Sequence, residues 1–423
     1  MENLLHYVWK YKLYNNLPLR TTQGDEVKVI DPGYHNQDAG PDFFNAKLKI
    51  GTTLWAGNVE IHTRSSDWIR HNHQCDSAYN SIILHVVSNN DSAVYNQEGR
   101  EVVQLIIEYP ESLRENYMAL LDSESRVACE ARLGEIDSLH WFSWKGRLLT
   151  ERLESKCRLV EEHLRDSCGD WEGAFYTLLG RSFGFSINSD PFERLVRAMP
   201  YSIVHKHSDS ILAIEALLFG QAGLLSDGSI ECSYYRELQR EWVYLRHKYG
   251  ITKAEVGGWR FAKMHSGNLP HVRIAEFASL YALRPRLLSE ILFPEITVKR
   301  ICEILMTHTS SYWDMHYSFG ERSDDRVKML GVSSALLLII NAVVPIMFSY
   351  GRSNGIESLC ERALSLLEEV KAEDNSITRS WGSMGFMPAN AYDSQALIQL
   401  QREYCDKKKC LFCAIGYRLL KIH

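Results

Sequence analysis

The 423-residue sequence predicts an α+β protein, in which an N-terminal mixed β-sheet with flanking helices is followed by a large all-α domain. In about the first 110 residues, several short segments alternate apolar and polar residues with a period of two, which is typical of half-buried strands. From about Leu139 onward, apolar residues instead recur at helical spacing. We therefore expect an α/β domain at residues 1–128, a helical domain at 129–388, and a C-terminal helix with a cysteine cluster at 389–423.

The same alternation places the elements of the N-terminal domain. The apolar residues between Leu4 and Trp9 predict an amphipathic opening helix. The run Ile82–Val87 has apolar residues on both faces and predicts a central buried strand, although His85 interrupts it. The remaining elements are expected at residues 27–30 (strand), beside Asp42 (strand), at 58–62 (strand), near 78–79 (short helix) and at 102–107 (strand).

The second half contains the longest apolar run of the chain, Ala335–Phe348. This run is broken by Asn341 and Pro345 and is too short to span a bilayer, so we expect no membrane segment. The N-terminus lacks the basic and apolar segments of a secretory signal. The ten cysteines are mostly scattered singly, which favours a reducing compartment. We therefore expect a cytoplasmic protein.

Charge is unevenly distributed along the chain. Residues 1–135 contain 19 acidic and 12 basic residues, whereas the remainder contains 34 acidic and 35 basic residues. A domain that grips duplex DNA alone usually carries a basic footprint. Any nucleic acid is therefore expected to be held largely by the second half, or to be short.

The most informative segment of the sequence joins Asp42 to Glu60 and His62. Val59 and Ile61 alternate with Glu60 and His62, so the two polar side chains are expected on one face of a strand. If Asp42 lies on the neighbouring strand, two carboxylates and one imidazole converge. Such a group suits a divalent cation held by the carboxylates. The structural alternative is that Asp42 caps a turn and that Glu60 and His62 line a solvated face.

This pattern, P-D-x17-E-x-H, resembles the motif of the PD-(D/E)xK nuclease superfamily. The resemblance implies a restriction-endonuclease-like fold, Mg2+ or Mn2+ bound by Asp42 and Glu60, and catalytic roles for Asp42, Glu60 and His62. His62 stands where the family usually has Lys. A lysine stabilises developing negative charge directly, whereas a histidine does so only when protonated.

Polar residues also cluster directly after the Glu60 strand. His71-x-His73 has the spacing of a pair of zinc ligands. However, a site of the H-x-H-x-D-H type needs Asp and His where this chain has Cys75 and Asp76. We therefore interpret the cluster as a rim of the Glu60 site. Arg64, with its permanently charged planar fork, is the strongest candidate for a phosphate contact. The residues expected to bind substrate are Arg64, Asp38 and His85.

Three cysteines near the C-terminus form a second candidate metal site. Cys405, Cys410 and Cys413 follow the spacing C-x4-C-x2-C. This spacing is similar to three ligands of a plant-type ferredoxin cluster, and zinc bound by three thiolates plus one further ligand is equally compatible. The fourth ligand is expected to be Cys129, with Cys360 and His423 as alternatives, and free thiols are the structural alternative. Residues Lys407–Lys409 are expected to lower the pKa of these thiols.

Taken over nearly its whole length, the sequence resembles an uncharacterised bacterial family known only as a domain of unknown function. The resemblance rests on the segments NQDAGPDF and GNVEIH and on the C-terminal cysteines. The function expected from these motifs is a metal-dependent nuclease that acts on DNA or RNA. The alternative is a catalytically silent, nuclease-derived module that binds nucleic acid or a protein partner.

Overall fold

The computed structural model describes residues 1–423 except 16, 37, 253–255, 263 and 422–423. The chain forms two compact units, of which unit 1 comprises residues 1–144 and 400–423 and unit 2 comprises residues 145–399. These limits differ from the domain limits expected at 128/129 and 388/389. The observed first limit, between residues 144 and 145, falls inside helix α4 (Ser138–Asp166), and the cysteine-containing C-terminal segment joins unit 1.

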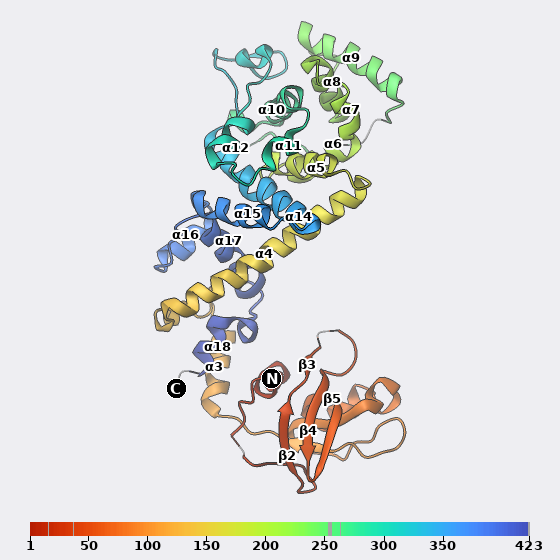
Figure 1. Cartoon of the computed structure of the whole chain (residues 1–423), viewed down its shortest axis with the longest axis vertical. Helices are drawn as coiled ribbons and strands as arrows, with labels where there is room; N and C mark the ends of the chain where they lie inside the picture. The colour runs from red at the N-terminus through yellow and green to blue at the C-terminus, as the bar shows by residue number, and fades with distance from the viewer. Residues whose placement is uncertain (16, 37, 253–255, 263, 422–423) are drawn as a thin grey trace. The chain divides into compact units, whose positions relative to one another are not determined.

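Unit 1 contains the predicted mixed sheet, whose neighbouring strands β2, β4 and β5 are labelled in Figure 1. In the described part of the chain the sheet has the order β1-β2-β4-β5-β6-β7, and β3 pairs with β4. Strands β2, β4 and β5 pair antiparallel, whereas β5, β6 and β7 pair in parallel. The strands are β1 (Leu19–Arg20), β2 (Glu26–Asp31), β3 (Tyr34–His35), β4 (Phe43–Ile50), β5 (Thr53–Arg64), β6 (Ile82–Asn89) and β7 (Gln104–Ile106).

The helices of unit 1 lie before, between and after these strands. They are α1 (Glu2–Lys10), α2 (Asp67–Arg70), α3 (Glu111–Asp122), α18 (Ala414–Lys421), the beginning of α4, the 3-10 segments His73–Cys75, Ser77–Ser81, Glu130–Glu135 and Cys410–Phe412, and the π-helical segment Leu400–Cys405. Leu4 and Val8 of α1 belong to the same core as Val59 of β5 and Val86 of β6. Leu420 of α18 joins this core, so residues from both ends of the chain bury one apolar face.

Unit 2 is mainly helical, as the sequence predicts, but it is not all-α. Its short hairpin, β8 (His316–Ser318) and β9 (Glu321–Arg322), turns at Gly320, whose φ of 77° favours glycine. The helices are α5 (Trp171–Phe183), α6 (Ser189–Ala198), α7 (Tyr201–His205), α8 (Ile211–Gln221), α9 (Ser233–Tyr249), α10 (Pro270–Leu283), α11 (Leu287–Ile291), α12 (Val298–Leu305), α13 (Val332–Leu338), α14 (Val344–Asn354), α15 (Glu357–Glu369), α16 (Ser376–Ser383) and α17 (Ala391–Gln399).

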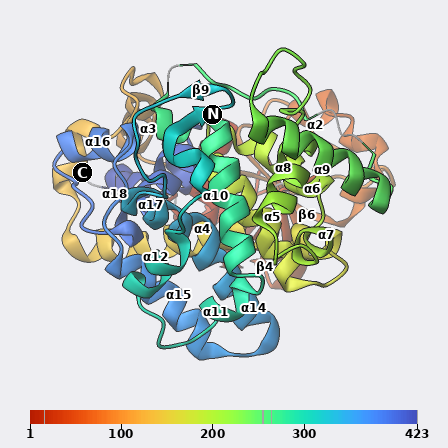
Figure 2. The ribbon, with the colours of Figure 1, turned by 90° about the horizontal axis from the view of Figure 1, so that it is seen from above.

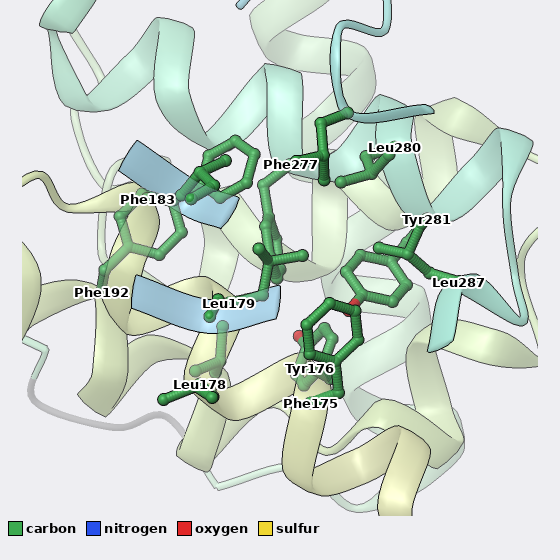
Figure 3. Close-up of a cluster of buried hydrophobic side chains, with 14 of the residues drawn as sticks. Phe175, Tyr176, Leu178, Leu179, Phe183, Phe192, Phe277, Leu280, Tyr281 and Leu287 are labelled. Atoms are coloured by element: carbon green, nitrogen blue, oxygen red, sulfur yellow. The ribbon is translucent and has the colours of Figure 1, made fainter. Parts of the chain in front are cut away.

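The core of unit 2 is organised around aromatic side chains, several of which Figure 3 shows. The ring of Phe277 in α10 lies 5.3 Å from Tyr176 and 5.2 Å from Phe183 of α5, and 5.7 Å from Phe192 of α6 (ring centroids). Such pairs contribute about 0.5–1.5 kcal/mol each beyond the burial of their area. Helices α8 and α9 lie side by side (Figures 1 and 2), and a Cβ added at Gly220 would meet Trp242 at 2.2 Å, so the close packing there requires glycine.

Asn341 and Pro345 interrupt the apolar run in the sequence, but they do not interrupt the helix that contains it. The helix continues from Val332 to Asn354 through a π-helical segment, Ile339–Val343. The Lys156 Nζ donates to the Ile340 carbonyl oxygen and to Asn341 Oδ1, both at 3.1 Å, so polar groups at this irregular turn are satisfied. By length and composition this stretch is apolar enough to cross a membrane, but most of it is buried in the core of unit 2.

One carboxyl group lies fully inside unit 2. Glu215 of α8 accepts hydrogen bonds from the Tyr234 hydroxyl (2.8 Å), the Ser310 hydroxyl (2.8 Å) and the Trp313 indole N–H (3.1 Å). Burial raises the pKa of Glu215 to about 7, and the three donors offset only part of that effect.

We expect Glu215→Gln to reduce the pH dependence of stability. The folded state binds the Glu215 proton more tightly than the unfolded chain, so the stability that it contributes is full below the ordinary pKa of 4.5 and is lost as the pH rises through about 7. Between about pH 5 and about pH 8, denaturant unfolding of the wild type should lose about 2–4 kcal/mol that the variant does not lose. Glu237→Gln, at an exposed position of α9, should keep the wild-type slope.

Candidate functional site

Asp42 and Glu60 are brought together by hydrogen bonds that run in both directions between two strands. Asp42 directly precedes β4, and the backbone N–H of Asp42 donates to Glu60 Oε2 at 3.1 Å. The backbone N–H of Ile61, on β5, donates to Asp42 Oδ2 at 2.9 Å. A bulge between Phe43 and Ala46 shifts the register of this pair of strands beside the two carboxylates.

Three histidines gather at the same end of β5. His62 lies on the same face as Glu60, and its Nε2 is 3.6 Å from Glu60 Oε1. His73 Nε2 is 3.3 Å from the same oxygen, and His62 Nε2 is 3.1 Å from His71 Nδ1. The ligand atoms of His62, His71 and His73 all lie within 4.8 Å of one another. We call Asp42, Glu60 and these three residues the histidine–carboxylate cluster.

The turn that returns His71 and His73 to the strand is held by polar contacts and packing. Asp67 Oδ2 accepts a hydrogen bond of 3.1 Å from the Arg64 backbone N–H. Asn72 adopts a left-handed conformation with φ 61°, which reverses the chain between the two histidines. The His73 ring stacks on Tyr79 with a centroid distance of 3.8 Å. The two histidines are therefore fixed by the fold rather than carried on a free loop.

His85 supports the cluster from the central strand. In the parallel register of β5 and β6, His85 lies opposite Glu60. His62 Nδ1 and His85 Nε2 share a hydrogen bond of 2.9 Å, and the His85 side chain is fully buried. A partner of this kind orients the imidazole whose other nitrogen binds a metal. The structure thus places His85 behind His62, although the sequence suggested a contact with substrate.

The charge states of the cluster follow from its burial. Burial and then the neighbouring histidines lower the pKa of His62 to about 2, and burial lowers that of His85 to about 4. Burial and the charge of Asp42 raise the pKa of Glu60. For His6, burial alone would lower the pKa, but the Asp42 carboxylate, 3.3 Å away, raises it on balance. His62 is therefore neutral and contributes no positive charge to the cluster.

These donors fit a transition metal ion. The imidazole nitrogens of His62, His71 and His73 and the Oε1 of Glu60 form a set of three nitrogens and one oxygen. Imidazole suits zinc and other nitrogen-preferring ions, whereas magnesium prefers oxygen ligands. Of the two ions expected from the sequence, manganese is the one that fits this mixed set better.

Arg64 and Asp38, the other residues expected to bind substrate, lie outside the cluster. Arg64 ends β5 and lines an open cavity of about 630 Å3 together with Glu2, Ser66, Asp67 and Arg70. Asp38 is exposed in the loop before β4, where its backbone N–H donates to Asn36 Oδ1 at 2.9 Å. Arg64 therefore lines a cavity in which a substrate contact stays a prediction, whereas Asp38 belongs to the loop that leads to Asp42.

The sequence places His71 and His73 in a rim of the Glu60 site but does not predict them, or His6, as ligands or catalytic groups. The H-x-H spacing is the signal for the first two, but the residues that follow do not match a known zinc motif. In the structure the pair approaches Glu60 and His62 instead of a ligand farther along the turn. His6 had no local signal, because α1 reaches Asp42 only through tertiary packing.

The fold also brings Cys129 to the three C-terminal cysteines. Burial raises the pKa of Cys405, and the thiols of Cys413, Cys129 and Cys410 raise it further. Burial, together with Cys413 and Cys410, raises the pKa of Cys129 to about 12. The expected lowering by the lysines is therefore wrong, because burial raises the pKa of all four thiols and the charge of Lys408 offsets only part of that effect at Cys410.

The two alternative fourth ligands are placed differently. Cys360 lies in α15 of unit 2, where its Sγ is 3.6 Å from the Phe348 carbonyl oxygen. His423 lies outside the described residues. The described cysteines are all free thiols.

Comparison with protein families identifies the class to which the chain belongs. Residues 2–376 match the model of a family described as a protein of unknown function (DUF2851). This match covers nearly the whole chain, so the chain belongs to the DUF2851 family, in agreement with the resemblance to an uncharacterised family. Neither the curated proteins nor the solved structures contain a match to this chain.

We expect Asp42→Ala to destabilise the protein more than Asp42→Asn does. The alanine leaves the Ile61 N–H without its acceptor, whereas the asparagine side-chain oxygen can still accept. An unsatisfied buried donor costs about 1–3 kcal/mol. Denaturant unfolding in the presence of a chelator measures the difference without a contribution from bound metal, and equal stabilities of the two variants would contradict the role assigned to this hydrogen bond.

Proposed function

We propose that this protein is a metal-dependent hydrolase of nucleic-acid phosphodiesters. The observation that supports it best is the convergence of Glu60 with His62, His71 and His73, beside Asp42, at one end of a mixed sheet. The resemblance of Asp42, Glu60 and His62 to the PD-(D/E)xK motif favours phosphodiester cleavage. The donor atoms favour manganese or zinc as the ion.

In this proposal each residue has a defined task. Glu60 Oε1 and the three imidazoles hold the ion, while Glu60 Oε2 stays bonded to the Asp42 N–H. Asp42 supplies the second carboxylate, which the Ile61 N–H and His6 orient. His85 fixes the ring of His62. An ion held by these residues would supply Lewis-acid activation of the phosphoryl oxygen and of an attacking water.

The position of Arg64 and the charge of the chain suggest which nucleic acids fit. Arg64 and Arg70 line the cavity at the end of β5, where a guanidinium group can form a bidentate pair of hydrogen bonds with a phosphate. However, the first 135 residues carry more acidic than basic residues. A short or single-stranded substrate fits this balance better than long duplex DNA, which requires a broad basic surface.

A second candidate function is a silent module that binds nucleic acid or a protein partner. The observation that favours it is that His62 is neutral where the nuclease family has a charged lysine. Without that charge the transition state has to be stabilised by the ion alone. The two functions share a metal site and differ in whether substrate is cleaved.

We expect the wild-type protein to bind about one manganese or zinc ion per chain at this site and to cleave short DNA or RNA. His73→Gln and Glu60→Gln should weaken metal binding, and cleavage should fall at least about 100-fold because the ion contributes several kcal/mol of charge stabilisation. Isothermal titration with each ion and cleavage of labelled oligonucleotides measure the two effects. Glu98→Gln and His140→Gln, at exposed positions, are the matched controls.

The outcomes separate the two candidate functions. If metal binding depends on Glu60 and His73 but no oligonucleotide is cleaved, the silent module is the candidate function that remains. A wild-type protein that binds neither ion would overturn the proposal. Cleavage that both substitutions leave unchanged would arise elsewhere and would also count against it.

We expect Arg64→Ala to raise KM for an oligonucleotide about tenfold, while kcat changes less. This is the effect of losing roughly one charge-assisted hydrogen bond to a phosphate. Steady-state kinetics at two salt concentrations measures it, since a phosphate contact also contributes to the salt dependence. Arg100→Ala serves as the control, because Arg100 is exposed and pairs with Glu98 at 3.2 Å. An unchanged KM in the Arg64 variant would remove Arg64 from the substrate site.

A further inference from the structure

We infer that Cys129, Cys405, Cys410 and Cys413 bind an iron–sulfur cluster that fastens the C-terminal segment into unit 1. This inference is independent of the proposed hydrolase activity. We call these residues the four-cysteine group. Cys129 precedes the 3-10 segment Glu130–Glu135, and the other three lie between the π-helical segment Leu400–Cys405 and α18.

Two contacts hold the C-terminal loop against the segment that precedes Cys129. The Lys408 Nζ donates to the carbonyl oxygens of Leu121 and Ser123. The Arg126 Nε lies 3.2 Å from Asp406 Oδ1. Because Lys408 and Asp406 lie between Cys405 and Cys410, these contacts bring Cys129 beside cysteines that are far away in the sequence. The mutual effects of the four thiols on their pKa values agree with this placement.

The loop around Cys410 and Cys413 directs hydrogen-bond donors at sulfur. Burial raises the pKa of the Cys413 thiol, and hydrogen bonding from the backbone N–H groups of Gly416 and Ile415 offsets part of that effect. A Cβ at residue 416 would lie 2.1 Å from the Cys410 carbonyl oxygen, so this approach requires glycine. Two backbone donors beside one buried sulfur are more than a neutral thiol needs, because a thiol is a weak acceptor. They suit a thiolate bound to a metal, whose hydrogen bonds tune iron–sulfur sites.

Among the described residues, the four cysteine sulfur atoms are not gathered as tightly as a single zinc ion requires. Four thiolates around one zinc, each at about 2.3 Å, would lie only about 3.8 Å apart in a tetrahedral site. Among the described residues, the group of three or more ligand atoms within 4.8 Å of one another is the histidine group, and the four cysteines do not form such a group. A wider arrangement suits a cluster, since its thiolates bind different iron atoms.

The four-cysteine group lies where a cross-link would join two distant segments of unit 1. Helix α18 packs against α3 and against the 3-10 segment Glu130–Glu135, and α18 and α3 are labelled next to each other in Figure 1. The Cys129 and Cys410 side chains pack on the core that α1 and the sheet share. Ligands from residue 129 and from residues 405–413 would therefore link two segments of unit 1 that the whole of unit 2 separates in the sequence.

The test uses the full chain, produced with iron and purified without oxygen. We expect iron and acid-labile sulfide in comparable amounts, and a broad visible absorption that dithionite bleaches. Cys129→Ser and Cys405→Ser should each lose most of the iron and lower the midpoint of thermal unfolding. Cys75→Ser, exposed in unit 1, and Cys302→Ser, buried in unit 2, should retain the iron.

The iron and sulfide content of the wild-type protein tests the inference even if a variant fails to fold. Iron with sulfide supports the inference, whereas a metal-free protein or one that holds zinc alone would overturn it. Iron retained in a folded Cys129→Ser variant would exclude Cys129 as a ligand and overturn the four-cysteine group. Glu60→Gln should keep its iron and sulfide, so failure of the hydrolase proposal can be told apart from failure of this one.

Discussion

The pair of hydrogen bonds between Asp42 and the β5 strand is the constraint on which the candidate site depends. One bond fixes Glu60 through the Asp42 N–H, and the other fixes Asp42 through the Ile61 N–H. A shift of one residue in this register would turn Glu60 and His62 to the opposite face of the sheet. The parallel register with β6 then sets His85 opposite Glu60, so the support of His62 follows from the same pairing.

The electrostatics of the cluster calls for a cation. Glu60 is buried beside a second carboxylate, and His62 is held neutral by burial and by the other histidines. Placing a proton on His62 would add charge to a group that is already poorly solvated. A metal ion can satisfy the carboxylate and the imidazole lone pairs together, because it binds the imidazoles in the neutral form that burial favours and its charge compensates the buried Glu60 carboxylate. This is the physical reason for the metal site that we propose.

Unit 1 is also assembled from two segments that are far apart in the sequence. Its core contains residues from α1 and from α18, which the 255 residues of unit 2 separate along the chain. Joining such distant segments has an entropic cost that grows slowly with the length of the interval. Leu411 and Leu420 offset part of this cost by apolar burial. The four-cysteine group lies among the same elements, where a bound metal would add a second link between the two segments of unit 1.

The sequence by itself determined the element types and which side chains share a strand face. Period-two alternation in residues 58–62 suffices to put Glu60 and His62 together, because side chains alternate across any strand. It did not determine that His71, His73 and His6 join them, since those approaches depend on a left-handed turn at Asn72 and on the packing of α1. Likewise, the C-x4-C-x2-C spacing is local, whereas the partnership with Cys129 is not. Contacts between residues far apart in sequence leave no periodic pattern, so only the tertiary structure decided them.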